Sequence, residues 1–145
     1  MAIRRVLSTE DGNLQKSTLI SSRTVDYLDI DLTFNKKPAG DIYKKRDAAA
    51  VKQSIKNLLL TDHYEKPFNP FFGANLRGML FELDTTDSII IEDNIKRLIG
   101  SYEPRARVDD VLVSSRGNDL NVSLYFTVQN DPSPHELDLI LTRVR

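Results

Sequence analysis

Residues 120–128, Leu-Asn-Val-Ser-Leu-Tyr-Phe-Thr-Val, alternate strictly between apolar and polar side chains. This period of two is typical of a β-strand that buries one face and exposes the other. Turn-forming residues flank it at 114–119 and 130–134, and further strand patterns lie beyond them at 111–113 and 136–144. Consecutive strands joined by short turns pair antiparallel. The last third of the chain is therefore predicted to form a three-stranded antiparallel meander.

Three helices are predicted before this meander, because apolar residues recur there at the spacing of a helix face. The first helix follows Asp47, which can cap it, and its apolar face holds Val51, Ile55, Leu58 and Leu59. The second follows Gly73, with Leu76, Met79, Leu80 and Leu83 as its face and with Gly78 inside it at a predicted close contact. The third begins near Thr86 or Asp87, ends at Gly100, and has as its face Ile91, Ile95, Leu98 and Ile99.

The first residues of the chain have a different character. Residues 1–24 are rich in Ser and Thr and carry no aromatic residue, so we expect a flexible N-terminal arm. Residues 27–34 alternate, which predicts a strand with a half-buried apolar side formed by Leu28, Ile30, Leu32 and Phe34. Residues 25–145 are expected to form a single α+β domain, with three helices packed on one face of a small antiparallel sheet.

Composition excludes several classes of function. The 145 residues contain 20 Lys and Arg, 21 Asp and Glu, and no Cys, so disulfides, thiolate nucleophiles and cysteine-ligated zinc are excluded. The longest aliphatic runs have three residues, which predicts no membrane partner and a soluble, intracellular chain. The net charge of −1 argues against nucleic-acid binding. The basic group at Lys36, Lys37, Lys44, Lys45 and Arg46 is therefore interpreted as a solvated loop.

Candidate catalytic residues are few. Glu82, Asp84 and Glu103 could serve as the acid and base of a glycosidase, but a raised pKa requires a pocket that a sequence does not show. His63 and His135 lack partners at metal-ligand spacing, which favours exposed loop histidines and no cofactor. No Walker loop, dinucleotide-binding glycine motif or serine nucleophile elbow is present.

Two motifs flank the third predicted helix. The first is Pro70-x-Phe72-Gly73-x-x-Leu76-x-x-x-Leu80-Phe81-Glu82, and the second is Tyr102-Glu103-Pro104-Arg105. With the helix over 51–61 and the meander, this order resembles the baseplate wedge and sheath-initiator family of contractile phage tails, over about residues 27–144. The same family is found in type VI secretion baseplates.

The resemblance implies a structural, non-enzymatic subunit of the virion, located in the tail baseplate and assembled in the host cytoplasm. Such a subunit docks on other baseplate wedge proteins, around the tail tube, and offers a strand edge that the tail sheath protein extends. The candidate edges are residues 27–34 and 136–144, because an unpaired edge can accept a strand. Members of the family have been labelled lysozyme-like, so a tail-associated peptidoglycan hydrolase is the alternative.

The resemblance also assigns a role to Glu103, Pro104 and Arg105. They are either local surface pairs beside a helix stop or, as the family implies, contacts to the wedge proteins. We expect partner binding, so that Arg105→Ala leaves the domain folded and weakens docking. Phe68, Phe71 and Phe72 are expected in the core, because clustered Phe usually belongs to the interior.

Overall fold

The computed structural model describes residues 27–80, 88–116 and 118–143. The predicted N-terminal arm, residues 1–24, lies outside this part, as do Leu83, Thr86 and Asp87 of the predicted helices. The α+β class, the helices and the C-terminal meander are confirmed. The elements, in chain order, are β1 (Leu28–Ile30), β2 (Lys44–Arg46), α2 (Asp47–Leu60), α3 (Leu76–Met79), α4 (Ser88–Tyr102), β3 (Ala106–Arg116), β4 (Asp119–Val128) and β5 (Asp131–Thr142).

The meander is an antiparallel sheet in the order β3-β4-β5. The apolar residues of the central strand are at most 2% exposed; they are Leu120, Val122, Leu124, Phe126 and Val128. The strands are longer than predicted, since β5 begins at Asp131 and contains Pro132 and Pro134. The predicted turn at 130–134 is therefore wrong beyond Asn130, and the predicted turn at 114–119 is too long, because β3 runs to Arg116 and β4 begins at Asp119. A proline is compatible with an edge strand when its nitrogen faces away from the neighbouring strand.

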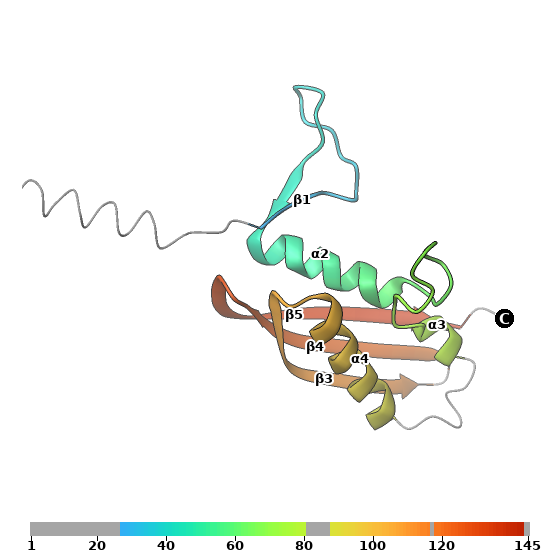
Figure 1. Cartoon of the computed structure of the whole chain (residues 1–145). Helices are drawn as coiled ribbons and strands as arrows, with labels where there is room; N and C mark the ends of the chain where they lie inside the picture. Colours follow the sequence, from blue (N-terminus) through green and yellow to red (C-terminus); the bar gives the residue numbers. More distant parts are fainter. Residues whose placement is uncertain (1–26, 81–87, 117, 144–145) are drawn as a thin grey trace, which may run out of the picture.

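The helices cover one face of this sheet, with α4 over β3 and α2 over β5 (Figure 1). The predicted core face of the first helix is confirmed, since Val51, Ile55, Leu58 and Leu59 are all buried. The predicted stop at Gly100 is wrong. Helix α4 continues to Tyr102, and the Glu103 N–H still donates to the Ile99 carbonyl at 2.8 Å. Pro104, which has no N–H, follows this last helical bond.

Two glycines hold close contacts around α3. Gly73 has a φ of +103°, and a Cβ there would lie 2.2 Å from the Thr61 carbonyl oxygen. A Cβ on Gly78 would lie 2.7 Å from the Asn75 side chain, so the predicted close contact exists, with a side chain as the neighbour. The loop from Thr61 to Gly73 therefore closes tightly against the end of α2.

β1 and β2 form a separate two-stranded antiparallel hairpin that projects from the rest of the molecule (Figure 1). The strand predicted over 27–34 is limited to residues 28–30. Its expected half-buried side is exposed at Leu28, Ile30, Leu32 and Phe34, so this prediction is wrong. The reason is that the hairpin contacts α2 and does not join the three-stranded sheet, so nothing in the described structure covers its apolar side.

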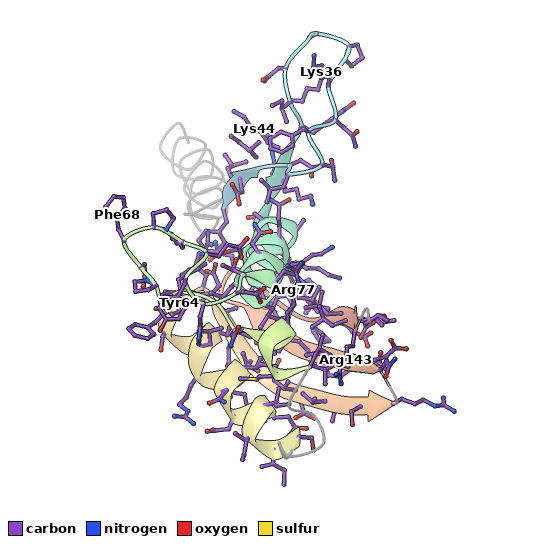
Figure 2. The ribbon with its side chains drawn as sticks, turned by 90° about the vertical axis from the view of Figure 1, so that its right-hand side faces the viewer. Lys36, Lys44, Tyr64, Phe68, Arg77 and Arg143 are labelled. Atoms are coloured by element: carbon purple, nitrogen blue, oxygen red, sulfur yellow. The ribbon has the colours of Figure 1, made fainter. Side chains whose placement is uncertain are left out.

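The Phe cluster behaves differently from the prediction. Phe68 is 107% exposed and Phe71 is also exposed, whereas Phe72 packs partly buried against the core. Phe68 and Tyr64 lie on the loop that extends away from α3 (Figure 2). Both have positive φ values, +67° each, which turn the loop outward. The expectation of a core position holds for Phe72 alone.

Candidate docking surfaces

The Glu103-Pro104-Arg105 segment connects the end of α4 to β3. Both carboxylate oxygens of Glu103 accept hydrogen bonds from Arg105, from Nε to Oε1 at 2.5 Å and from Nη2 to Oε2 at 2.6 Å. The Glu103 side chain is 4% exposed and the Arg105 side chain is 36% exposed. The segment therefore holds an internal bidentate pair whose carboxylate faces inward and whose guanidinium reaches the surface.

Other elements hold this pair in place. Gln129, after β4, donates from its side chain to the Pro104 carbonyl at 3.0 Å and from its backbone N–H to the Arg105 carbonyl at 3.1 Å. The Arg105 guanidinium also lies 5.2 Å from the centre of the Tyr27 ring, within the range of a cation–π contact. The segment is thus fixed on both sides, and Pro104 remains exposed between the two paired side chains.

The electrostatics of Glu103 favour its ionised form. Burial of the carboxyl group acts to raise its pKa, but hydrogen bonds from Arg105 and Ser54 and the charge of Arg105 outweigh burial, so the pKa lies below its usual value. A glycosidase general acid needs the opposite shift. Glu103 is consequently a poor candidate for the acid of a hydrolase, and the other two candidates, Glu82 and Asp84, lie outside the described residues.

The hollow beside the loop that carries Tyr64 and Phe68 holds no acidic side chain from the described part of the chain. It has a volume of about 330 Å³ and lies between the loop, α3 and α4, with His63, Phe71, Met79, Leu98 and Tyr102 among its lining residues. Among the described residues that line it, none carries a carboxylate. The other histidine, His135, lies on β5 with Nε2 at 3.2 Å from Asp131 Oδ2. Within the described ranges, no three His, Asp or Glu side chains are grouped so as to hold a metal ion.

The two edges of the three-stranded sheet differ. At the β3 edge, the Val111 N–H donates to the Asp110 carboxylate at 2.9 Å, and the Val113 N–H donates to Glu92 of α4 at 3.3 Å. A β-bulge between Val108 and Asp110 also interrupts this strand. Side-chain caps and bulges protect an edge from further pairing. The β3 edge is therefore largely closed.

The orientation of β5 follows from one hydrogen bond. The Arg143 N–H donates to the Asn118 carbonyl at 2.8 Å, and bonded and non-bonded pairs alternate along an antiparallel ladder. In the register of β4 with β5, the N–H groups of Leu137, Leu139 and Leu141 then face β4. The N–H groups of four residues face outward, and these are Glu136, Asp138, Ile140 and Thr142. No side chain of the described residues caps these four groups, so this edge of β5 is open.

The basic group lies on the projecting hairpin, where Figure 2 labels Lys36 and Lys44. Lys45 pairs with Asp31 at 3.3 Å, and Lys37 lies 5.7 Å from the centre of the Tyr43 ring. The group is mostly exposed, as predicted, but the prediction of a loop is wrong for Lys44, Lys45 and Arg46, because they form strand β2. Among the described helices, none has the length and apolar composition needed to cross a membrane.

Sequence reasoning identified the Glu103–Arg105 segment but missed the residues that close or open the sheet edges. Glu92 caps β3 from a different element, so no local pattern indicates it. The open edge did leave a signal. Pro132 and Pro134 lack N–H groups and lie in β5, and two prolines at alternate positions of one strand are typical of an edge.

Comparison with known proteins places the chain in context. Residues 45–133 match the family model described as baseplate wedge protein gp25. The baseplate wedge protein gp25 of Enterobacteria phage T4 is 29% identical over 113 residues, which cover 76% of this chain and 86% of that protein.

Solved structures show the same fold at low sequence identity. A chain of the anti-feeding prophage baseplate has a TM-score of 0.56 at 19% identity, covering 83% of this chain and 89% of its own length. A chain of the post-contraction pyocin R2 baseplate gives 0.53 at 21%, covering 71% and 99%. A putative tail lysozyme from Geobacter sulfurreducens gives 0.53 at 21%, covering 66% and 89%.

Proposed function

The chain belongs to the baseplate wedge protein gp25 family, and from this premise we propose that it starts the tail sheath by accepting a strand along β5. A structural role in the baseplate of a contractile tail follows from the family, and so does location in the virion. The strand-accepting step is the part that the proposal adds. The tail sheath protein is the partner that this step requires.

The open edge of β5 carries this proposal. Four outward N–H groups and their neighbouring carbonyls on residues 136–142 have no hydrogen-bond partner among the described residues, whereas side chains and a bulge occupy the edge of β3. Main-chain hydrogen bonds give affinity in strand addition, and they need only a free edge of sufficient length. Pro132 and Pro134 restrict that edge to the second half of β5.

We further propose that the Glu103-Pro104-Arg105 segment binds other baseplate wedge proteins. Arginine favours bidentate carboxylate contacts at protein interfaces. The exposed part of Arg105 and the exposed Pro104 can reach a partner, while buried Glu103 positions the guanidinium from inside. A further contact to the tail tube is compatible with this arrangement.

The proposal requires no enzymatic step and no cofactor. The lowered pKa of Glu103 disfavours the hydrolase alternative, and so does the hollow beside α4, where no described residue supplies a carboxylate. Clearing of cell-wall substrate by the purified full chain in zymography, lost on Glu103→Gln, would favour that alternative instead.

The strand-accepting step is tested by replacing one outward N–H. Ile140→Pro removes the N–H that faces away from β4, so it leaves the β4–β5 ladder intact and blocks an added strand at its centre. Ile140→Ala is the matched control, because it removes the same side chain and keeps the N–H. Baseplates carrying each variant are mixed with the tail sheath protein and inspected by electron microscopy. We expect sheathed tails with Ile140→Ala and about tenfold fewer with Ile140→Pro. Equal sheath assembly on both variants would contradict the proposal.

A further inference from the structure

A groove runs beside the open edge of β5. Its volume is about 640 Å³, and its walls come from the hairpin loop, from α2 and from β5 itself. Its lining residues include Lys45, Ala49, Lys52, Lys56, Leu137 and Asp138. A strand added to β5 would lie along this groove, with alternate side chains facing α2.

We propose that the segment accepted in this groove carries two carboxylates, at alternate positions, on its side facing α2. This inference rests on the proposed function, because it concerns the strand that β5 accepts. It adds the chemistry by which the segment is recognised. The occupant is an extended acidic segment of a protein.

The charge of the groove supports this choice of occupant. Among the described residues that line the groove, three are lysines and one, Asp138, is acidic. Lys45 is paired with Asp31, but neither Lys52 nor Lys56 has an ion pair among the described residues. Two unpaired cations above an open strand edge favour carboxylates on an incoming strand.

The spacing of the two lysines fits a strand. Residues four apart on a helix are separated by about 6 Å along its axis. Residues two apart on a strand are separated by about 6.8 Å and point to the same side. Carboxylates at positions i and i+2 of the segment can therefore reach Lys52 and Lys56 together.

The side of the sheet that faces away from α2 restricts the register of the incoming strand. Glu136 is exposed there, beside Tyr125, whose pKa is raised chiefly by its hydrogen bond to Glu136 and further by the negative charges of Glu136 and Asp138. Asp138 lines the rim of the groove, but its side chain alternates with those of Leu137 and Leu139 and so belongs to this side of the strand. A slip of the incoming strand by one residue would move its carboxylates to this acidic side. Like charges on neighbouring strands are unfavourable. The lysines on one side of β5 and the acidic residues on the other thus favour the register in which the carboxylates of the segment point toward α2.

The leucines of β5, of which Leu137 lines the groove, are also less completely buried than the apolar residues of the central strand. Leu137, Leu139 and Leu141 are 4%, 7% and 8% exposed, whereas Leu120, Val122 and Leu124 are at most 1% exposed. A further strand would complete the burial of these leucines. The same strand would satisfy the outward N–H groups.

The experiment tethers probe segments to the full chain. Thr-Asp-Thr-Glu-Thr, Thr-Asn-Thr-Gln-Thr and Thr-Lys-Thr-Lys-Thr are each joined to the C-terminus by a Gly/Ser linker of about 20 residues, which spans about 25 Å. Tethering gives millimolar effective concentration, so weak pairing becomes measurable. Hydrogen exchange at the outward N–H groups of Asp138 and Ile140 is followed by NMR.

We expect the acidic probe to slow exchange about fivefold to tenfold more than the basic probe, with the neutral probe between them. In Lys52→Glu/Lys56→Glu this order reverses, whereas Lys36→Glu/Lys37→Glu, which changes the net charge equally on the hairpin loop, keeps it. The difference in protection between the acidic and basic probes should shrink in 1 M salt, because the Debye length there falls to about 3 Å.

The alternative outcomes separate the two proposals. Equal protection by all three probes, unchanged in Lys52→Glu/Lys56→Glu, would overturn the acidic segment and leave strand addition to β5 standing. Protection of the β3 edge, or no protection of β5 by any probe, would overturn both.

Discussion

The side chain of Gln53, on α2, forms hydrogen bonds with the backbone at Ile30 and Leu32, as the backbone of a neighbouring strand would. Its side-chain amide donates to the Ile30 carbonyl at 2.7 Å, and its carbonyl oxygen accepts from the Leu32 N–H at 3.3 Å. Gln53 is buried, and through it α2 holds the first strand of the projecting hairpin. Asp47, at the start of α2, adds a second contact, because its carboxylate accepts a hydrogen bond from the Tyr27 N–H at 3.4 Å.

This contact predicts a local effect of Gln53→Ala. The change removes two hydrogen bonds, which together contribute about 1–3 kcal/mol, and leaves the sheet untouched. We expect backbone amides of 28–46 to exchange faster in NMR hydrogen exchange, while β4 amides keep their protection. Asn57→Ala, one turn further along α2, is the control and should change neither region. Loss of protection in β4 would show that Gln53 supports the core instead.

The Glu103–Arg105 pair predicts a measurable loss of stability in Arg105→Ala. The change leaves the buried Glu103 carboxylate without its bidentate partner, and an unpaired buried group costs about 1–3 kcal/mol. Urea unfolding at pH 7 should show this loss. In the background of Glu103→Gln, Arg105→Ala should cost less, because the carboxylate is already absent. Equal costs in both backgrounds would mean that the two residues act independently.

The lowered pKa of Glu103 predicts a pH dependence. A carboxyl group with a lower pKa in the folded state stabilises the fold above its unfolded pKa, and this contribution is lost as the pH falls through the folded pKa. Glu103→Gln should therefore be less stable than the parent chain at pH 7. The difference should shrink steadily below about pH 4. Urea unfolding midpoints at pH 7, 5 and 3 measure it, and a difference independent of pH would contradict the assignment.

The sequence predicted the meander and the core face of α2 because burial there follows a simple period. Val122 lies on the buried face that the two-residue period of β4 predicts, and Ile55 lies on the buried face that the helical period of α2 predicts. The burial of the hairpin was mispredicted. Alternating apolar and polar residues indicate a strand with one apolar and one polar face, but they do not indicate whether another element covers the apolar face. Leu28 and Ile30 have the pattern of a half-buried strand, but the sheet that would bury them lies elsewhere.

The candidate docking surfaces were predicted only in part, because a sequence indicates contacts between residues that are near one another in the chain. Glu103 and Arg105 are two residues apart, so their pairing is local, and the motif indicates it. Which edge of the sheet is closed depends in part on Glu92 and Val113, which lie 21 residues apart and whose hydrogen bond caps the β3 edge. Such a contact exists only after the chain has folded.

Replacing each of three glycines by alanine should change the stability of the fold, with a different sign at different positions. Gly100→Ala should stabilise α4 by about 0.5–1 kcal/mol, because the position is helical and a Cβ there meets nothing within 4 Å. Gly40→Ala should destabilise modestly, because its φ is +87° and the space is open. Gly73→Ala should destabilise more, since it adds a clash with the Thr61 carbonyl to a positive φ. Thermal unfolding ranks the three, and equal effects of Gly40→Ala and Gly73→Ala would show that the loop relaxes.

Docking through Arg105 predicts a difference between two variants of one ion pair. Both Arg105→Ala and Glu103→Gln break the pair, but the surface-reaching guanidinium is lost in the first alone. Truncating one member of a close charge pair at an interface costs about 2–5 kcal/mol. We therefore expect Arg105→Ala to weaken binding to the other wedge proteins at least about tenfold. Glu103→Gln should weaken it about threefold or less, through less exact positioning of Arg105.

Titration calorimetry with the assembled wedge proteins measures both variants under conditions where each is fully folded. Urea unfolding of the same samples gives their stabilities, so the loss of binding can be compared with the loss of folding free energy. If the two variants lose affinity in proportion to their lost stability, Arg105 is a structural residue and the docking surface lies elsewhere. If affinity depends on the guanidinium while stability does not distinguish the variants, its exposed part contacts the partner directly.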